Sequence, residues 1–313
     1  MAIAAKCRPE IDIEDMISSY ELSGIPRSLF ALDGSLLPST DKSNLMHILE
    51  DMADKDGSDS TPFIPVHQQS VTSENTSIID GMAIVHQLAG RQGHIKNCSE
   101  FSAELITTLQ QKIKNYDSLH VVFDQYNVTP SLKEATRKRR TSKIESRHLI
   151  CTDSTPIITS LATFITHVMT KASLTEYLSC KVLEYFKHGE KIVVVSTETG
   201  ARSYHADVDS LSSSHEEADP ILILHALHAY KSGSNVHIMS PDTDVFILAL
   251  YHVPTLGDSI SVIVGTGAKQ RSVFLKPIYD AIGANIAAAL LGFHSFTGCD
   301  VTGRFSGKGK ITC

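Results

Sequence analysis

The sequence lacks the features that mark membrane and secreted proteins. No apolar run approaches the roughly 20 residues that a membrane-spanning helix needs, so we expect no membrane partner. The first residues contain no apolar stretch of signal-peptide length. The six cysteines are isolated and form no CxxC pair, which disfavours zinc ribbons and disulfide frameworks. Together these absences predict an intracellular protein, in the reducing environment of the nucleus or the cytoplasm.

Positive charge is also scarce. The chain has 28 Lys and Arg against 35 Asp and Glu, a net charge of −7, which by itself disfavours a nucleic-acid-binding protein. The excess acid, however, lies entirely within residues 1–70, which hold 5 basic and 12 acidic residues, so residues 71–313 are neutral. We therefore interpret 1–70 as an acidic, partly ordered N-terminal extension and 71–313 as the functional domain.

Hydrophobic residues make up 42% of the chain, which is enough for a sizeable core. Short apolar runs predict strands at 77–80, 119–124, 191–196, 235–240, 261–265 and 272–275. Longer amphipathic runs predict helices at 81–89, 131–147, 159–187, 218–230 and 277–298, while 244–250 fits a helix or a buried strand. This alternation predicts an α/β fold with a doubly wound, mainly parallel sheet flanked by helices. Strands that are apolar throughout predict a sheet covered on both faces.

Acidic residues follow several of the predicted strands. Asp80 and Asp124 end the first two, and Asp242 with Asp244 follows the strand at 235–240. The carboxyl ends of parallel strands form the ligand-binding edge of such a sheet, so these side chains are expected to converge. Further candidates lie before the helix at 218–230, within its first turn, and after the last helix. The full candidate set is Asp80, Asp124, Glu217, Asp219, Asp242, Asp244 and Asp300.

A cleft with seven carboxylates needs cations. Two unit charges about 4 Å apart repel by roughly 4 kcal/mol at an effective dielectric constant of 20. Hard divalent ions with oxygen ligands offset that repulsion, and Mg²⁺ takes only a few carboxylates, so seven fit two ions better than one. Two such ions form the clamp used for in-line phosphoryl displacement.

Each acid also has a structural interpretation that the residues alone leave open. Ser214 to Glu217 matches a capping box, which would explain Glu217 by helix capping. Asp242 and Asp244 match an N-cap followed by a first-turn acid. Only the joint placement of the acids favours a site.

Five motifs in order resemble the flap-endonuclease (XPG-like) branch of the PIN-like nucleases, over residues 76–310. They are SIIDGMAIVHQL (77–88), LHVVFDQYNVTPSLKEATRKRR (119–140), HEEADP (215–220), SPDTDVFILAL (240–250) and LKPIYDAIGANIAAALLGFHSFTGCD (275–300). The resemblance implies a PIN-like fold and a metal-dependent nuclease that hydrolyses phosphodiester bonds in DNA or RNA with two Mg²⁺ or Mn²⁺ ions.

The resemblance also implies roles for individual residues. One metal group would comprise Asp80, Asp124, Glu217 and Asp219, and the other Asp242, Asp244 and Asp300. Lys133 and Arg140, on a basic gateway helix, would steady the scissile phosphate. Residues 131–150 carry 7 basic and 2 acidic groups, a plausible footprint for a nucleic-acid backbone. The run at 137–143 also fits a solvated basic face or a nuclear-import signal.

The chain departs from the family pattern in three places. Seventy-nine residues precede Asp80, Asp219 stands where the family has Glu, and Pro220 follows it. FSGKGK (305–310) looks like the start of the family's helix–hairpin element, so either that element is missing or the sequence is a fragment. Two alternatives follow: a catalytically inactive PIN-like nucleic-acid-binding or scaffold protein, and a phosphatase acting on small phosphate esters.

Overall fold

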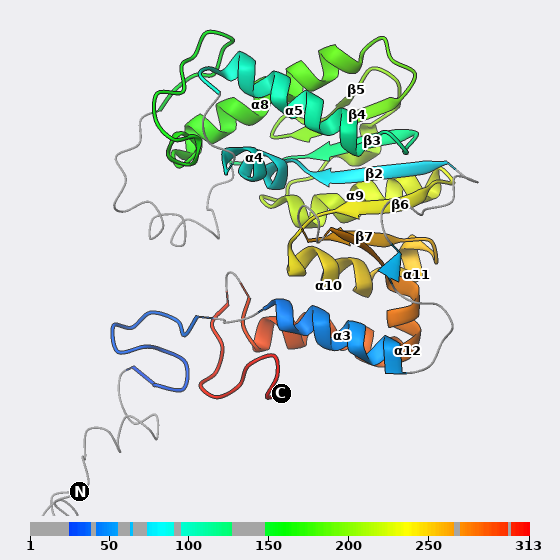
Figure 1. Cartoon of the computed structure of the whole chain (residues 1–313). Helices are drawn as coiled ribbons and strands as arrows, with labels where there is room; N and C mark the ends of the chain where they lie inside the picture. Colours follow the sequence, from blue (N-terminus) through cyan, green and yellow to red (C-terminus); the bar gives the residue numbers. More distant parts are fainter. Residues whose placement is uncertain are drawn as a thin grey trace, which may run out of the picture.

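One eight-stranded sheet organises the molecule, with strand order β1-β8-β7-β6-β2-β3-β4-β5 (Figure 1). The computed structural model describes residues 25–38, 42–55, 63–64, 74–90, 95–126, 148–265, 270–299 and 302–313. The strands are β1 (Phe63–Ile64), β2 (Asn75–Asp80), β3 (Ser118–Val122), β4 (Ile192–Thr197), β5 (Gly200–Ser203), β6 (Asn235–Met239), β7 (Ser261–Val264) and β8 (Arg271–Phe274). The helices are α3 (Ser43–Lys55), α4 (Gly81–Ala89), α5 (Cys98–Lys112), α7 (Leu161–Phe164), α8 (Val168–Phe186), α9 (Ala218–Lys231), α10 (Thr243–Tyr251), α11 (Val253–Leu256) and α12 (Leu275–Phe296), with a 3₁₀ turn, η2 (Asp209–Leu211).

The centre of the sheet is parallel and its edges are antiparallel. Strands β4, β3, β2, β6 and β7 run in the same direction, while β5 pairs antiparallel with β4, and β8 with β7 and β1. The predicted α/β class with a mainly parallel sheet is thus confirmed.

Helices cover both faces of the sheet, so its central strands are buried along most of their length, including polar residues such as Thr76, Ser77 and His120. Consecutive residues of one strand belong to different cores: Ile78 is part of the cluster that includes residues of α9, α10, α11, α12 and α3, whereas Ile79 is part of the cluster that includes residues of α4, α5, α7 and α8. In β6, Ile238 belongs to the same cluster as Ile78, and Met239 belongs to the same cluster as Ile79. Since side chains alternate along a strand, a sheet covered on both sides has no solvent-exposed face at its centre.

The order of the strands creates a switch point. The first parallel strand in the chain is β2. The chain then moves outward through β3 to β4, and returns to the other side of β2 with β6 and β7. Neighbouring connections therefore leave β2 and β6 in opposite directions, and a crevice opens beyond their carboxyl ends. In Figure 1 the arrowhead of β2 points to the left, where α4 begins.

Most predicted elements are present. The predicted helix at 159–187 is divided into α7 and α8, and 244–250 is helical, as part of α10. Gly283, with a φ of 78°, interrupts the helix predicted at 277–298. Helices α5 and α11, strands β1 and β5 and the turn η2 were not predicted, and the predicted helix at 131–147 lies outside the described residues.

Helix α3 lies inside the predicted N-terminal extension, yet it packs on the core. Leu45, Met46, Leu49 and Ala53 are buried in the same hydrophobic cluster as α10 and α12. Figure 1 shows α3 running alongside α12. The division of the chain at residue 70 stays a prediction, but α3 contributes to the core on one face of the sheet.

In the described part of the chain, each helix is either too short or too polar to cross a lipid bilayer.

Candidate metal centre

Asp80 lies where β2 ends and α4 begins. It is the N-cap of α4, and its Oδ1 accepts a hydrogen bond from the backbone N–H of Ala83 at 3.0 Å. Gly81 follows it because the helix starts directly against Phe123: a Cβ at this position would lie 2.5 Å from the Phe123 ring. The absence of a side chain at residue 81 thus lets α4 begin close to β3.

Asp124 joins the end of β3 to the start of α9. Its Oδ1 accepts from the backbone N–H of Ala218 at 2.9 Å, and its Oδ2 accepts from the Tyr126 hydroxyl at 3.3 Å. Glu217 occupies the N-cap position of α9 but makes no side-chain capping bond. The capping box proposed for Ser214 and Glu217 is therefore not formed, because the aspartate from β3 supplies the capping oxygen instead.

Asp242 and Asp244 follow β6 at the start of α10. Asp242 is the N-cap, and its Oδ1 accepts from the backbone N–H of Asp244 at 3.0 Å. The capping interpretation is therefore correct for this pair. Capping does not account for the whole arrangement of Asp242 and Asp244, because oxygens of Asp219, Asp242 and Asp244 all lie within 4.8 Å of one another. All three residues are half-buried.

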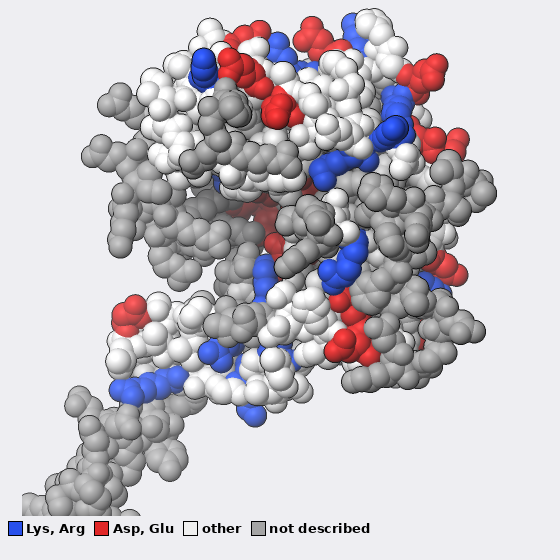
Figure 2. Space-filling model, viewed as in Figure 1, with Lys and Arg blue, Asp and Glu red and all other residues white. Residues whose placement is uncertain are grey.

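Five of the candidate carboxylates share one cleft of about 880 Å³ at the switch point of the sheet. In Figure 2 acidic side chains lie deep in the hollow near the middle of this face, and basic side chains lie around it. The acids that line the cleft are Asp80, Asp124, Glu217, Asp219 and Asp242. Basic residues line it as well, namely Lys42 and Lys171, together with His86.

Three predicted site residues cannot be placed. Asp300, Lys133 and Arg140 lie outside the described residues, as does most of the basic segment 131–150. Their roles remain predictions.

Burial and like charges act on the carboxylates in different ways. Burial, with the charges of Asp124 and Asp242 nearby, raises the pKa of Asp80 to about 6 from an ordinary 3.8. Burial also acts to raise the pKa of Asp244, but the hydrogen bond from His294 and the charge of Lys42 outweigh it and hold that pKa below its ordinary value. The Asp80 carboxyl is therefore costly to ionise, whereas the Asp244 carboxyl is kept ionised.

The donor set fits a hard divalent cation. Carboxylate oxygens are the preferred ligands of Mg²⁺, Mn²⁺ and Ca²⁺, and no sulfur or imidazole atom belongs to the described three-residue cluster. The pKa of Asp80 is raised mainly by burial and to a smaller extent by the charges of Asp124 and Asp242, and a bound cation would offset both effects. The residues present thus fit the ions predicted from the sequence.

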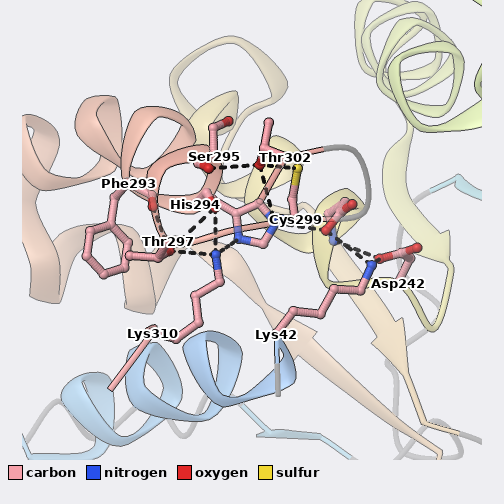
Figure 3. A network of polar contacts seen from close by, with 10 residues as sticks. Lys42, Asp242, Phe293, His294, Ser295, Thr297, Cys299, Thr302 and Lys310 are labelled. Carbon is pink, nitrogen blue, oxygen red and sulfur yellow. Dashed lines mark hydrogen bonds and ion pairs between the residues drawn. The ribbon is translucent and has the colours of Figure 1, made fainter. Parts of the chain in front are cut away.

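A second group of residues, which the sequence did not indicate, supports Asp244 (Figure 3). The Nε2 of the buried His294 contacts Asp244 Oδ1 at 2.8 Å, and its Nδ1 lies 2.9 Å from Lys310 Nζ. The ammonium of Lys310 also donates to the His294 carbonyl and the Thr297 hydroxyl, both at 2.7 Å. An ammonium donating to Nδ1 leaves the ring hydrogen on Nε2, so His294 donates to Asp244.

Replacing Asp80 by Asn should stabilise the metal-free protein while weakening metal binding. Asn keeps an acceptor for the Ala83 N–H but carries no charge. Because the native-state pKa lies above the ordinary value, ionised Asp80 reduces stability above about pH 6 and has no such effect below about pH 4. In chelator at pH 7.5 we expect a gain on the order of 1–3 kcal/mol in urea unfolding. A gain that persisted at pH 4 would contradict this explanation.

Replacing His294 by Ala should weaken Mn²⁺ binding, because the hydrogen bond that orients Asp244 is lost. Removal of such a partner typically costs about 10–100-fold in metal affinity. Calorimetric titration with Mn²⁺ measures the change, and His294→Gln, which keeps an N–H donor, should recover part of it. Equal affinities in wild type and both variants would show that Asp244 needs no such support.

Comparison with solved structures finds proteins of similar fold. Neither a protein family nor a curated protein matches the sequence. The D15 flap endonuclease of bacteriophage T5, solved with DNA and metal ions, is 12% identical with a TM-score of 0.42, over 74% of this chain and 70% of that chain. The catalytic core of Rad2, solved with a DNA substrate, is 14% identical with a TM-score of 0.46, over 84% of this chain and 63% of that chain.

The first of these structures is a flap endonuclease, the kind of protein that the five sequence motifs resemble. At identities and TM-scores this low, the similarity is no evidence of function, and only the residues of this chain and their geometry can support one.

Proposed function

We propose that the chain is a metal-dependent nuclease that hydrolyses phosphodiester bonds in DNA or RNA with two Mg²⁺ or Mn²⁺ ions. One observation carries the proposal: acids from the ends of β2, β3 and β6 and from the start of α9 line a single cleft. Structural capping explains the hydrogen bonds of Asp80, Asp124 and Asp242, but it gives no reason for the three caps to face one another.

The metal groups implied by the sequence motifs need one adjustment. The motifs assign Asp219 to the group of Asp80, Asp124 and Glu217. In the structure an oxygen of Asp219 is within 4.8 Å of oxygens of Asp242 and Asp244. We therefore assign Asp219 a position between the two groups, where its carboxylate can serve either ion.

The mechanism follows from what these residues can hold. When bound, two divalent ions stabilise the charge that develops on the attacking and leaving oxygens of an in-line displacement. Asp80, Asp124 and Asp242 would hold those ions in positions already fixed by hydrogen bonds from backbone N–H groups, so that little reorganisation would accompany the reaction. Lys171, on the wall of the cleft, supplies positive charge for a phosphate diester. Lys133 and Arg140 are proposed to steady the scissile phosphate.

Nucleic acid is the proposed substrate because the cleft combines acids with lysines and because the segment 131–150 is basic. A nuclear or cytoplasmic location agrees with this proposal. A phosphatase for small esters would have no use for that basic segment.

One observation favours the alternative of a nucleic-acid-binding protein without turnover. The ammonium of Lys42 lies 2.8 Å from Asp242 Oδ1, and thus already compensates part of the acidic cluster. A chain whose own lysine neutralised the site permanently would bind nucleic acid and not cleave it.

A cleavage assay decides between the two. Labelled flap, single-stranded and duplex substrates, as DNA and as RNA, are incubated with the protein in Mn²⁺, in Mg²⁺ and in chelator. The nuclease proposal predicts metal-dependent products from at least one substrate. Binding of the same substrates in a mobility-shift assay, with no product in either metal, would reject the nuclease and support the binding protein.

A further inference from the structure

Lys42 places a cation against two of the candidate metal ligands. Its Nζ donates to Asp242 Oδ1 at 2.8 Å and to Asp244 Oδ1 at 3.3 Å (Figure 3). The side chain of Lys42 is only 26% exposed, and the residue lines the cleft. A divalent ion shared by Asp242 and Asp244 would compete with Lys42, because the ammonium already contacts one oxygen of each carboxylate.

The position of Lys42 is set by the helix that follows it. Helix α3 is held to the core by its apolar side and by Glu50, which is 4% exposed. Both carboxylate oxygens of Glu50 lie 2.9 Å from Nη2 of Arg271 on β8. Because its Glu50 carboxylate is buried, this ion pair with the partly exposed Arg271 resists displacement, so Lys42 is directed to the cleft by tertiary packing.

The contact does not serve the stability of α3 itself. Lys42 directly precedes the helix, at the end where the helix dipole disfavours a positive charge. The first turn of α3 contains no acidic residue that would compensate it. The compensation comes from Asp242 and Asp244, 200 and 202 residues later in the chain.

We propose that Lys42 is an internal counter-ion that a divalent metal ion has to displace from Asp242 and Asp244. The inference rests on the proposed function, since it takes these carboxylates as metal ligands. Without metal, the ammonium relieves the repulsion between them. On metal binding it leaves their Oδ1 atoms, so occupancy of the site is coupled to the start of α3. The competition lowers the apparent metal affinity and weakens as salt screens the charges.

Metal titration of four proteins tests the inference with a readout that does not depend on cleavage. Mn²⁺ binding is measured by calorimetry at low ionic strength for wild type, Lys42→Met, Lys42→Arg and Lys276→Met. Lys276 pairs with Asp280 on the exposed side of α12, so its variant removes one positive charge elsewhere. We expect Lys42→Met to tighten binding about tenfold, within the usual 5–150-fold range of coupled sites. Lys42→Arg and Lys276→Met should bind as wild type does.

An unchanged or weaker affinity in Lys42→Met would overturn the inference and leave the proposed nuclease standing. No Mn²⁺ binding in either wild type or Lys42→Met would contradict both.

A measurement on the wild type avoids dependence on the variants. Acetylation of Lys42 by a water-soluble reagent, followed by mass spectrometry, should become faster at saturating Mn²⁺, because the displaced ammonium is more accessible. The acetylation of Lys276 serves as the internal reference. A Lys42 rate that does not change with Mn²⁺, while calorimetry detects binding, would show that the ion does not displace the ammonium.

Discussion

Asp242→Asn should reduce cleavage by roughly 10³-fold, because bound ions supply several kcal/mol of transition-state stabilisation and each ~1.4 kcal/mol is a factor of ten in rate. Asp242 belongs to the cluster with Asp219 and Asp244, and it also lines the cleft. The amide keeps an oxygen that can cap α10, so the N-cap bond to Asp244 N–H can be retained. The loss of activity is therefore expected without loss of the fold.

Single-turnover cleavage, circular dichroism and Mn²⁺ titration on the same preparation separate these effects. Asp280→Asn is the matched control, since it makes the same chemical change on an exposed carboxylate that pairs with Lys276. It should cleave as wild type does. Equal activity in wild type and Asp242→Asn would remove Asp242 from the proposed mechanism, while a variant that binds Mn²⁺ unchanged would remove it from the metal ligands.

Gly81→Ala should destabilise the protein by about 1–3 kcal/mol, the usual cost of overpacking a core. The new Cβ would lie 2.5, 2.6 and 2.9 Å from three ring atoms of Phe123, which is completely buried. Either the ring or the start of α4 has to move. Both lie beside candidate ligands, since Asp80 precedes Gly81 and Asp124 follows Phe123, so metal affinity should fall as well. Urea unfolding and Mn²⁺ titration measure the two effects.

Two further variants test the cause of that loss. Gly292→Ala lies within α12 with no atom within 4 Å of the added Cβ, so it should be neutral or stabilising by up to about 1 kcal/mol. Phe123→Leu removes part of the ring that the Cβ would strike. Combined with Gly81→Ala, it should cost less than the sum of the two single changes, because the residues are in contact. Strict additivity would show that the clash is relieved elsewhere.

Local sequence was sufficient to predict the sheet and the acids along its edge. Apolar runs of strand length, separated by amphipathic runs, predict a parallel sheet because each strand is buried on both faces, as Ile78 and Ile79 are. Asp80 and Asp242 follow such runs directly, so their position at the carboxyl edge follows from strand direction alone. Helix α5 was not predicted, although it has the same kind of signal: Asn97 caps it, and Phe101, Leu105 and Leu109 recur at helical spacing.

What the sequence determined by itself is therefore the α/β class, the parallel sheet and the gathering of strand-end carboxylates, since each depends on near neighbours in the chain. Tertiary structure decided which group caps α9, where Asp124 replaces the predicted capping box. It also brought an oxygen of Asp219 within 4.8 Å of one of Asp242, and placed His294, which contacts Lys310, in hydrogen-bond contact with Asp244. Lys42 reaches Asp242 across 200 residues, and only the docking of α3 makes that contact. Contacts of this kind leave no periodic signal, because they depend on how separate elements pack.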